Sequence, residues 1–209
     1  MNLFNHGDHV CVLYDSRDEQ LKVAAEYVVE GLRLGERCFY AAVSSDDLGQ
    51  FRAALDAAGA DVAAALTDGA LELATKHEAH LTGGYFDSER MLRMLDAAVE
   101  RALNDGFLGL RTCGDMSWLL DEASGSGQVI EYEALLSQFF RNVRAVGMCQ
   151  YDRRRIPAGL LDHALATHPS VVVGGRHRSN PFYQTAPRLA SVPAQMADVE
   201  WKLREIRRR

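Results

Sequence analysis

Short apolar runs alternate along the chain with longer segments in which apolar residues recur every three or four positions. The runs span residues 9–14, 37–43, 70–75, 107–113, 145–151 and 171–173. Continuous apolar runs are typical of strands buried on both faces of a parallel sheet, and a period near 3.6 residues is typical of amphipathic helices. The alternation predicts an α/β fold with three layers: a mostly parallel sheet of about six or more strands, with helices on both faces.

Capping residues mark where several of the predicted helices begin. Ser16, followed three positions later by Glu19, has the pattern of a capping box. Ser45 is expected to cap the second helix, and Asp87 or Ser88 the helix before the central strand. Further helices are predicted over about 128–142 and 157–167, with a short helical turn over 61–66. Residues 76–86 and 176–187 are expected to be irregular.

The C-terminal segment carries apolar residues spaced alternately three and four positions apart. They are Leu189, Val192, Met196, Val199, Leu203 and Ile206. This is the stripe of a coiled coil, but it covers fewer than three heptads, so two alternatives stay open. The helix either docks onto its own domain or pairs with a second chain in a homodimer through residues 189–206. We therefore divide the chain into a domain of residues 1–187 and a C-terminal amphipathic helix of residues 188–209.

Charge and composition argue against several classes of partner. The 209 residues include 23 Lys and Arg and 29 Asp and Glu, a net charge of −6. Proteins that bind nucleic acid directly usually present a basic face, so we expect no such contact. No run approaches the roughly 20 apolar residues of a membrane span, and the first residues do not form a basic and apolar signal peptide. We expect a cytoplasmic protein that does not contact a membrane.

Residues of unusual chemistry follow the central strand. Asp115, Met116 and Trp118 come just after the apolar run of residues 107–113. A plain turn would favour Gly, Asn, Pro or Ser, and the carboxyl ends of parallel strands face the crevice where α/β proteins bind ligands. Met116 and Trp118 therefore either face a ligand or fill the core beneath a loop.

The predicted ligand-binding set joins the strand ends to polar residues that could anchor a ligand. Glu133, in the middle of a helix, either points inward or is solvated. Residues at or just after strand ends are Tyr14, Asp15, Asp115, Met116, Trp118, Tyr151 and Asp152, and the added residues are His9, Cys11, Arg111, Glu133 and His168.

Metal binding is one alternative for the first strand. His9 and Cys11 share a strand face, and with Cys113 or Cys149 from a neighbouring strand they could hold zinc or copper(I). Each of the four cysteines lies inside an apolar run, however, so burial as a free thiol is the favoured interpretation. We predict no metal and no cofactor.

Sequence motifs for catalysis are missing. The turn of residues 14–19 after the first strand contains no glycine and three carboxylates, which argues against a phosphate loop. Neither His163 nor His168 has a serine or cysteine at a recognisable catalytic spacing. We expect no catalytic residues and a protein that is not an enzyme.

Several segments, taken in order, resemble the MEDS domain, a sensory domain named from methanogens, methylotrophs and the DcmR regulator of dichloromethane metabolism. They are residues 9–14, 27–40, 109–118, 132–133, 149–154, 167–169 and 180–183. The resemblance implies a regulatory module that senses small one-carbon or hydrocarbon-derived molecules. Such domains are usually fused to an output unit, whereas only the heptad-like helix follows residue 185 here. We therefore expect output in trans, through a homodimer or a regulatory partner such as a kinase, an anti-sigma factor or a transcription regulator.

A second, more distant similarity concerns the fold. Residues 31–40 are similar to the segment after the first helix of RecA/KaiC-like ATPases, and Asp115 lies where their acidic strand would end. Because the phosphate loop is missing, this implies a degenerate ATPase fold whose crevice serves another ligand. Our leading prediction is a small-molecule sensor. The alternatives are an interaction module without a small ligand and a residual KaiC-like nucleotide-binding protein.

Overall fold

A seven-stranded sheet forms the middle layer of the molecule. In the computed structural model, which describes residues 4–120, 126–185 and 196–208, the strand order is β3-β2-β4-β5-β1-β6-β7. All strands are parallel to their neighbours except β7, which is antiparallel to β6. The strands are β1 (His9–Tyr14), β2 (Arg37–Ala42), β3 (Leu71–Thr75), β4 (Leu110–Asp115), β5 (Ala145–Asp152), β6 (Ser170–Val173) and β7 (Arg176–Ser179). This confirms the predicted α/β fold with a mostly parallel sheet.

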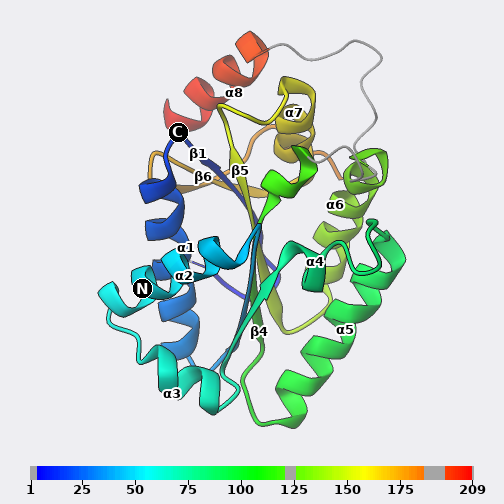
Figure 1. Cartoon of the computed structure of the whole chain (residues 1–209). Helices are drawn as coiled ribbons and strands as arrows, with labels where there is room; N and C mark the ends of the chain where they lie inside the picture. Colours follow the sequence, from blue (N-terminus) through cyan, green and yellow to red (C-terminus); the bar gives the residue numbers. More distant parts are fainter. Residues whose placement is uncertain (1–3, 121–125, 186–195, 209) are drawn as a thin grey trace.

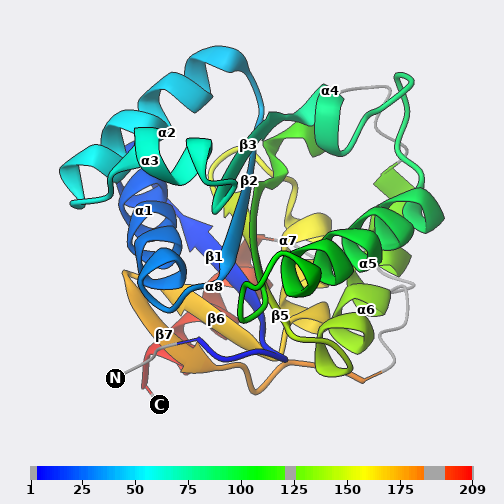
Figure 2. The ribbon, with the colours of Figure 1, turned by 90° about the horizontal axis from the view of Figure 1, so that it is seen from below.

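Helices cover both faces of the sheet (Figures 1 and 2). One layer holds α1 (Arg17–Arg33), α2 (Ser45–Ala57) and α3 (Val62–Thr67). The other holds α4 (Lys76–Ala79), α5 (Ser88–Asn104), the 3₁₀ helix η1 (Met116–Leu120), α6 (Ser126–Arg141), α7 (Ala158–Thr167) and α8 (Met196–Arg208). The chain crosses the sheet in one direction from β1 to β3 and in the other from β3 to β6. Because such crossovers are right-handed, the two directions place their helices on opposite faces.

Local capping explains where the first helices begin. Ser16 Oγ accepts the backbone N–H of Glu19 at the start of α1, as predicted. The Glu19 carboxylate accepts the N–H of Asp15, at 2.9 Å, so the second bond of the capping box is shifted by one residue. Ser44 rather than Ser45 caps α2, because Ser44 has the extended backbone that a cap requires.

The central strand begins later than predicted. Residues 107–113 were expected to form it, whereas β4 spans Leu110–Asp115. After α5 the chain turns at Gly106, whose φ is +91°, and the N–H of Phe107 still donates to Ala102 at the helix end. The first apolar residues of the run therefore belong to this turn, and Asp115 is the last residue of the strand instead of lying beyond it.

Two segments expected to be irregular contain regular structure. Residues 76–86 include α4, which begins with a capping box between Thr75 and Glu78. Residues 176–187 include β7, an edge strand of polar residues that pairs with β6. Neither element has apolar periodicity, because one is a single helical turn and the other is held mainly by backbone hydrogen bonds.

The C-terminal helix docks onto its own domain. Val199, Leu203 and Ile206 of α8 are fully buried in the core beneath α7, and Lys202 pairs with Asp162 of α7. Three of the heptad positions are thus covered within the chain, and a homodimer through them would have to displace these contacts. Leu189 and Val192 lie outside the described residues. Among the residues described, no helix is both long and apolar enough to cross a membrane.

Candidate functional site

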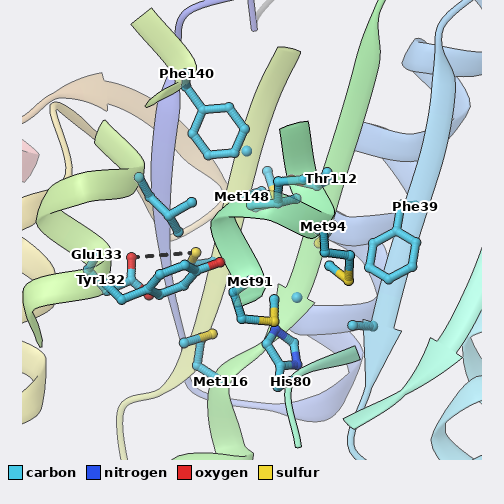
Figure 3. Close-up of a pocket in the computed structure, with 17 residues that line it drawn as sticks. Phe39, His80, Met91, Met94, Thr112, Met116, Tyr132, Glu133, Phe140 and Met148 are labelled. Atoms are coloured by element: carbon cyan, nitrogen blue, oxygen red, sulfur yellow. Dashed lines mark hydrogen bonds between the residues drawn. The ribbon is translucent and has the colours of Figure 1, made fainter. Parts of the chain in front are cut away.

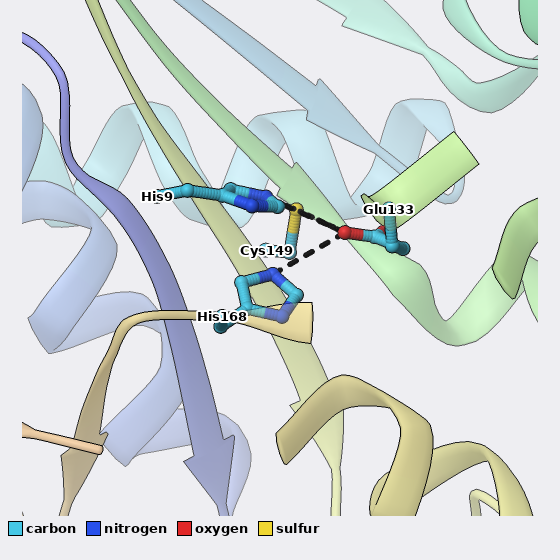
Figure 4. A group of neighbouring side chains, drawn as sticks. All are labelled: His9, Glu133, Cys149 and His168. Atoms are coloured by element: carbon cyan, nitrogen blue, oxygen red, sulfur yellow. Dashed lines mark hydrogen bonds and ion pairs between the residues drawn. The ribbon is translucent and has the colours of Figure 1, made fainter. Parts of the chain in front are cut away.

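Four buried side chains with metal-ligating atoms meet between the sheet and α6 (Figure 4). His9 begins β1, Glu133 lies in α6, Cys149 lies in β5 and His168 follows α7. One ligating atom from each lies within 4.8 Å of all the others. Glu133 Oε2 is 3.4 Å from His9 Nε2 and 3.3 Å from His168 Nε2. Cys149 Sγ is 3.5 Å from His9 Nε2. We call these four residues the buried cluster.

The outer nitrogens of both imidazoles are held by hydrogen bonds. His168 Nδ1 lies 2.7 Å from the carbonyl of Ala164, which can only accept, so Nδ1 carries the proton. Ser137 Oγ donates to the carbonyl of Thr167 and lies 2.8 Å from His9 Nδ1, so that nitrogen donates to the hydroxyl. In both neutral rings, Nε2 therefore presents a lone pair toward the cluster.

The carboxylate and the thiol are also held in place. Tyr151 donates from its hydroxyl to Glu133 Oε1 at 3.0 Å, which leaves Oε2 facing the cluster. Cys149 Sγ is 3.8 Å from that oxygen. Cys11, beside Cys149 in the register of β1 and β5, is buried next to the cluster.

Burial dominates the electrostatics of the cluster. It lowers the pKa of His9 to about 3 and that of His168 to about 3, so both imidazoles are neutral. Burial raises the pKa of Glu133, while His168 and the hydrogen bonds from Tyr151 and Cys149 oppose that rise. Burial, and then the nearby Glu133, raises the pKa of the Cys149 thiol well above its ordinary value. The cluster thus consists of two neutral imidazoles and two weakly acidic groups. They lie in the protein interior, where a charge without a partner is energetically costly.

An apolar chamber adjoins the buried cluster (Figure 3). It lies between the sheet and helices α5 and α6, with a cavity volume of about 40 Å³. A cavity needs roughly 10–15 Å³ to hold one water molecule, so this space suits a molecule of a few heavy atoms. Glu133 and Cys149 form part of its wall, and much of the rest comes from Phe39, His80, Met91, Met94, Met116, Tyr132 and Phe140.

Two strand glycines shape the chamber. A Cβ at Gly147 would lie 2.3 Å from the ring of Phe140, so only glycine lets α6 approach β5 this closely. A Cβ at Gly114 would lie 3.5 Å from His80, an ordinary van der Waals contact, so a methyl group there would fit against the His80 ring. His80 stacks on Trp118, with ring centroids 5.1 Å apart, and its Nδ1 has no hydrogen-bond partner among the described residues.

The expected crevice at the strand ends is organised differently. Asp115 accepts the N–H of Ser117 at 2.9 Å and lies 3.6 Å from Arg17. Tyr14 forms a hydrogen bond with the hydroxyl of the same serine, at 3.2 Å. Trp118 is fully buried, which places it among core residues and not on an open ligand-facing loop.

The remaining strand-end acids are engaged by nearby basic residues. Asp15 forms an ion pair with Arg153 at 2.6 Å, and Asp152 accepts the backbone N–H of Arg154 at 3.0 Å. These contacts hold the loops together at that edge of the sheet. They lie apart from the buried cluster.

Arg111 lies on the opposite face of the sheet. Its Nε donates to Glu36 at 2.5 Å, and its guanidinium sits 4.6 Å from the ring centroid of Tyr27. The side chain is fully buried under α1. It therefore does not reach the chamber, because alternate residues of a strand point to opposite faces.

The structure thus brings together part of the predicted set. His9, Glu133 and His168 converge, Tyr151 contacts Glu133, and Met116 lines the chamber. Sequence reasoning left Cys149, Ser137 and His80 out of the set. Glu133 and Ser137 are four positions apart on the buried face of α6. This spacing places both side chains on one face of a helix, so it could have predicted that both point inward.

Comparison with known proteins supports the fold and a regulatory class. The family model described as MEthanogen/methylotroph, DcmR Sensory domain (MEDS) matches residues 8–169, a range that includes the whole buried cluster. The transcriptional repressor DcmR of Methylorubrum extorquens is 29% identical over 165 residues, which cover 78% of this chain and 58% of the repressor. This chain therefore matches little more than half the length of that relative.

A solved structure is similar in fold. The crystal structure of the flagellar accessory protein FlaH from Methanocaldococcus jannaschii superimposes with a TM-score of 0.60 at 11% identity, covering 84% of this chain and 76% of that one. At this identity the likeness shows the fold alone, which is RecA-like.

Proposed function

Because the chain belongs to the MEDS family of sensory domains, we propose that it binds a small molecule in the apolar chamber and reports binding to a regulatory partner. The observation that carries this proposal is a chamber of about 40 Å³ with buried polar groups in its wall. Binding sites for small molecules combine apolar walls with a few fixed polar groups. Glu133 and Cys149 of the buried cluster, together with His80, supply those polar groups here.

The chemistry of the wall narrows the class of ligand. Met91, Met94 and Phe39 provide polarisable, apolar surface that suits a methyl, methylene or halogen group. Glu133 and the free Nδ1 of His80 could bind one polar group of the same molecule. We therefore propose a one-carbon or short hydrocarbon derivative carrying no more than one polar function.

The proposed signal travels through the helices on that face. Glu133 belongs to α6, α6 packs against α7, and α7 carries the docked α8. A ligand shifts an equilibrium only by its differential affinity for two arrangements. We propose that filling the chamber changes how α6 and α7 support α8, whose exposed Trp201 would then meet a partner protein differently.

We favour sensing over nucleotide binding or catalysis because of the residues in the turn after β1. The turn after β1 places carboxylates where a phosphate loop would need glycines and a lysine. Asp15 in that turn forms an ion pair with Arg153. The positive charge of Arg153 is therefore already neutralised by a carboxylate and is not free to bind a phosphate.

A thermal denaturation panel tests the proposal. Purified protein would be heated with dichloromethane, other halomethanes, methanol, formaldehyde and, separately, MgATP. A ligand at a hundredfold excess over its Kd adds about 2.7 kcal/mol of stability. We expect stabilisation by at least one small organic compound and none by MgATP. Stabilisation by MgATP alone would favour the nucleotide-binding alternative, and no response to any compound would favour an interaction module.

A further inference from the structure

We propose that His9, Glu133, Cys149 and His168 bind one divalent metal ion of the zinc type. The inference goes beyond the proposed sensing role and does not depend on it, because the four residues meet whether or not the chamber is filled. It also differs from the expectation drawn from the sequence, which favoured burial of the cysteines as free thiols and no metal.

Four of the six distances between the ligand atoms are close to those of a tetrahedral site, and the other two are within 4.8 Å. Zinc binds histidine nitrogen at about 2.0–2.1 Å, thiolate sulfur at about 2.3 Å and carboxylate oxygen at about 2.0–2.2 Å, so neighbouring ligand atoms lie roughly 3.3–3.7 Å apart. Glu133 Oε2 lies 3.4 Å from His9 Nε2, 3.3 Å from His168 Nε2 and 3.8 Å from Cys149 Sγ. Cys149 Sγ lies 3.5 Å from His9 Nε2. A single ion would reach all four atoms with only small adjustments.

The hydrogen bonds leave lone pairs pointing at one another. Both Nε2 atoms face inward without protons, because Nδ1 of His9 donates to Ser137 and Nδ1 of His168 donates to Ala164. Glu133 Oε2 is a third acceptor, since Tyr151 occupies Oε1. The Cys149 thiol can donate to only one of these acceptors, and His168 Nε2 has no hydrogen-bond partner among the described residues.

Several acceptors that face one another with too few donors make an unfavourable hydrogen-bond network. The same acceptors can all bind a cation placed between them. Buried polar atoms are normally satisfied, and partly satisfied networks are costly. Two neutral imidazoles, one carboxylate and one thiolate balance the charge of a divalent ion, so the filled site would be neutral. The combination of nitrogen, sulfur and oxygen ligands suits zinc better than calcium or magnesium, which prefer oxygen alone.

The surrounding residues supply the outer contacts that metal sites use. Metal-binding histidines usually donate their other ring nitrogen to a protein oxygen, and ligating carboxylates are themselves hydrogen-bonded. Ser137, Ala164 and Tyr151 fill these roles for His9, His168 and Glu133. Three of the four ligands are therefore oriented before an ion arrives.

Cobalt substitution provides the test. The purified chain would be stripped of metal with a chelator and titrated with Co²⁺, which gives visible bands in a tetrahedral site and a near-ultraviolet charge-transfer band when thiolate is bound. We expect saturation at one ion per chain with both signals, and displacement of cobalt by zinc. No binding, or binding without the thiolate band, would overturn the proposal.

Variants locate the site. Cys149→Ser should remove the charge-transfer band, and Ser137→Ala should weaken binding by roughly 10–100-fold as an outer-contact change. Cys38→Ser is the matched control, because Cys38 is also buried but lies on the other face of the sheet. Loss of the band in the control, or its retention in Cys149→Ser, would contradict the assignment.

A measurement without mutation guards against variants that fail to fold. X-ray absorption of the zinc-loaded wild-type chain should show one sulfur at about 2.3 Å and three nitrogen or oxygen ligands at about 2.0–2.2 Å. A shell without sulfur, or one of six oxygen ligands, would place the ion elsewhere and overturn the proposal. Because these readouts follow the metal alone, they are independent of whether an organic ligand enters the chamber.

Discussion

His80 should make the fold sensitive to mild acid. Its ring is buried, stacks on Trp118 and lines the apolar chamber, and its Nδ1 has no hydrogen-bond partner among the described residues. Burial lowers the pKa of His80 from 6.5 to about 4. Because the unfolded chain binds this proton more readily than the folded one, the stabilising contribution is complete above about pH 6.5 and is lost progressively as the pH falls toward 4.

The magnitude follows from that difference in pKa. One pKa unit corresponds to about 1.4 kcal/mol, so moving from pH 7 to pH 5 should cost about 2 kcal/mol through this residue alone. We expect His80→Gln to lose about 2 kcal/mol less than the wild type over that interval. His9 and His168 also make the free energy of unfolding depend on pH. Both are present in the wild type and in His80→Gln, so their contributions cancel when the two proteins are compared.

Urea denaturation at the two pH values, followed by tryptophan fluorescence, measures the effect. His77→Gln is the matched control, because His77 lies three positions away and is exposed. It should lose as much stability as the wild type. If His80→Gln lost the same free energy as the wild type between pH 7 and pH 5, burial would not lower the pKa of His80 as described.

Three further substitutions test the packing. Gly147→Ala should destabilise the fold by about 1–3 kcal/mol in urea denaturation, because the added Cβ would lie 2.3 Å from the Phe140 ring. An unchanged free energy of unfolding would mean that α6 can move away from β5 without cost. Leu203→Ala should cost about 2–5 kcal/mol in the same assay if α8 is docked, whereas exposed Arg204→Ala should cost little. Arg111→Ala should cost about 3–5 kcal/mol of unfolding free energy, because the buried carboxylate of Glu36 would lose its guanidinium partner and keep only its contact with His6. A loss below 1 kcal/mol would contradict that pairing.

The layers of the fold could be predicted because their signals are local. The apolar run of residues 9–14 and the cap at Ser16 act within a few positions, and β1 and α1 appear where expected. The strand Arg176–Ser179 could not be predicted in this way. It lies at the edge of the sheet and pairs through its backbone with β6, so its polar side chains carry no alternation.

The candidate site depends on strand order, which the sequence does not state. His9 was considered with Cys113 or Cys149 as alternative neighbours, and β5, which contains Cys149, is the strand that pairs with β1. Cys113 lies one strand further away, in β4. The rule that ligands bind at strand carboxyl ends predicted Asp15 and Asp115 as ligand-binding residues. In the structure both carboxylates are instead paired with arginines from a nearby loop and helix.

The most direct test of the sensing role is calorimetric titration of whichever small organic compound stabilises the protein. Gly114→Ala adds a methyl group at the wall of the chamber, where it meets His80 at an ordinary contact distance, while Gly49→Ala adds one in open space on α2. We predict that Gly114→Ala weakens binding at least tenfold and that Gly49→Ala binds like the wild type. Equal affinity of all three proteins would show that the ligand binds outside the chamber and would contradict the account.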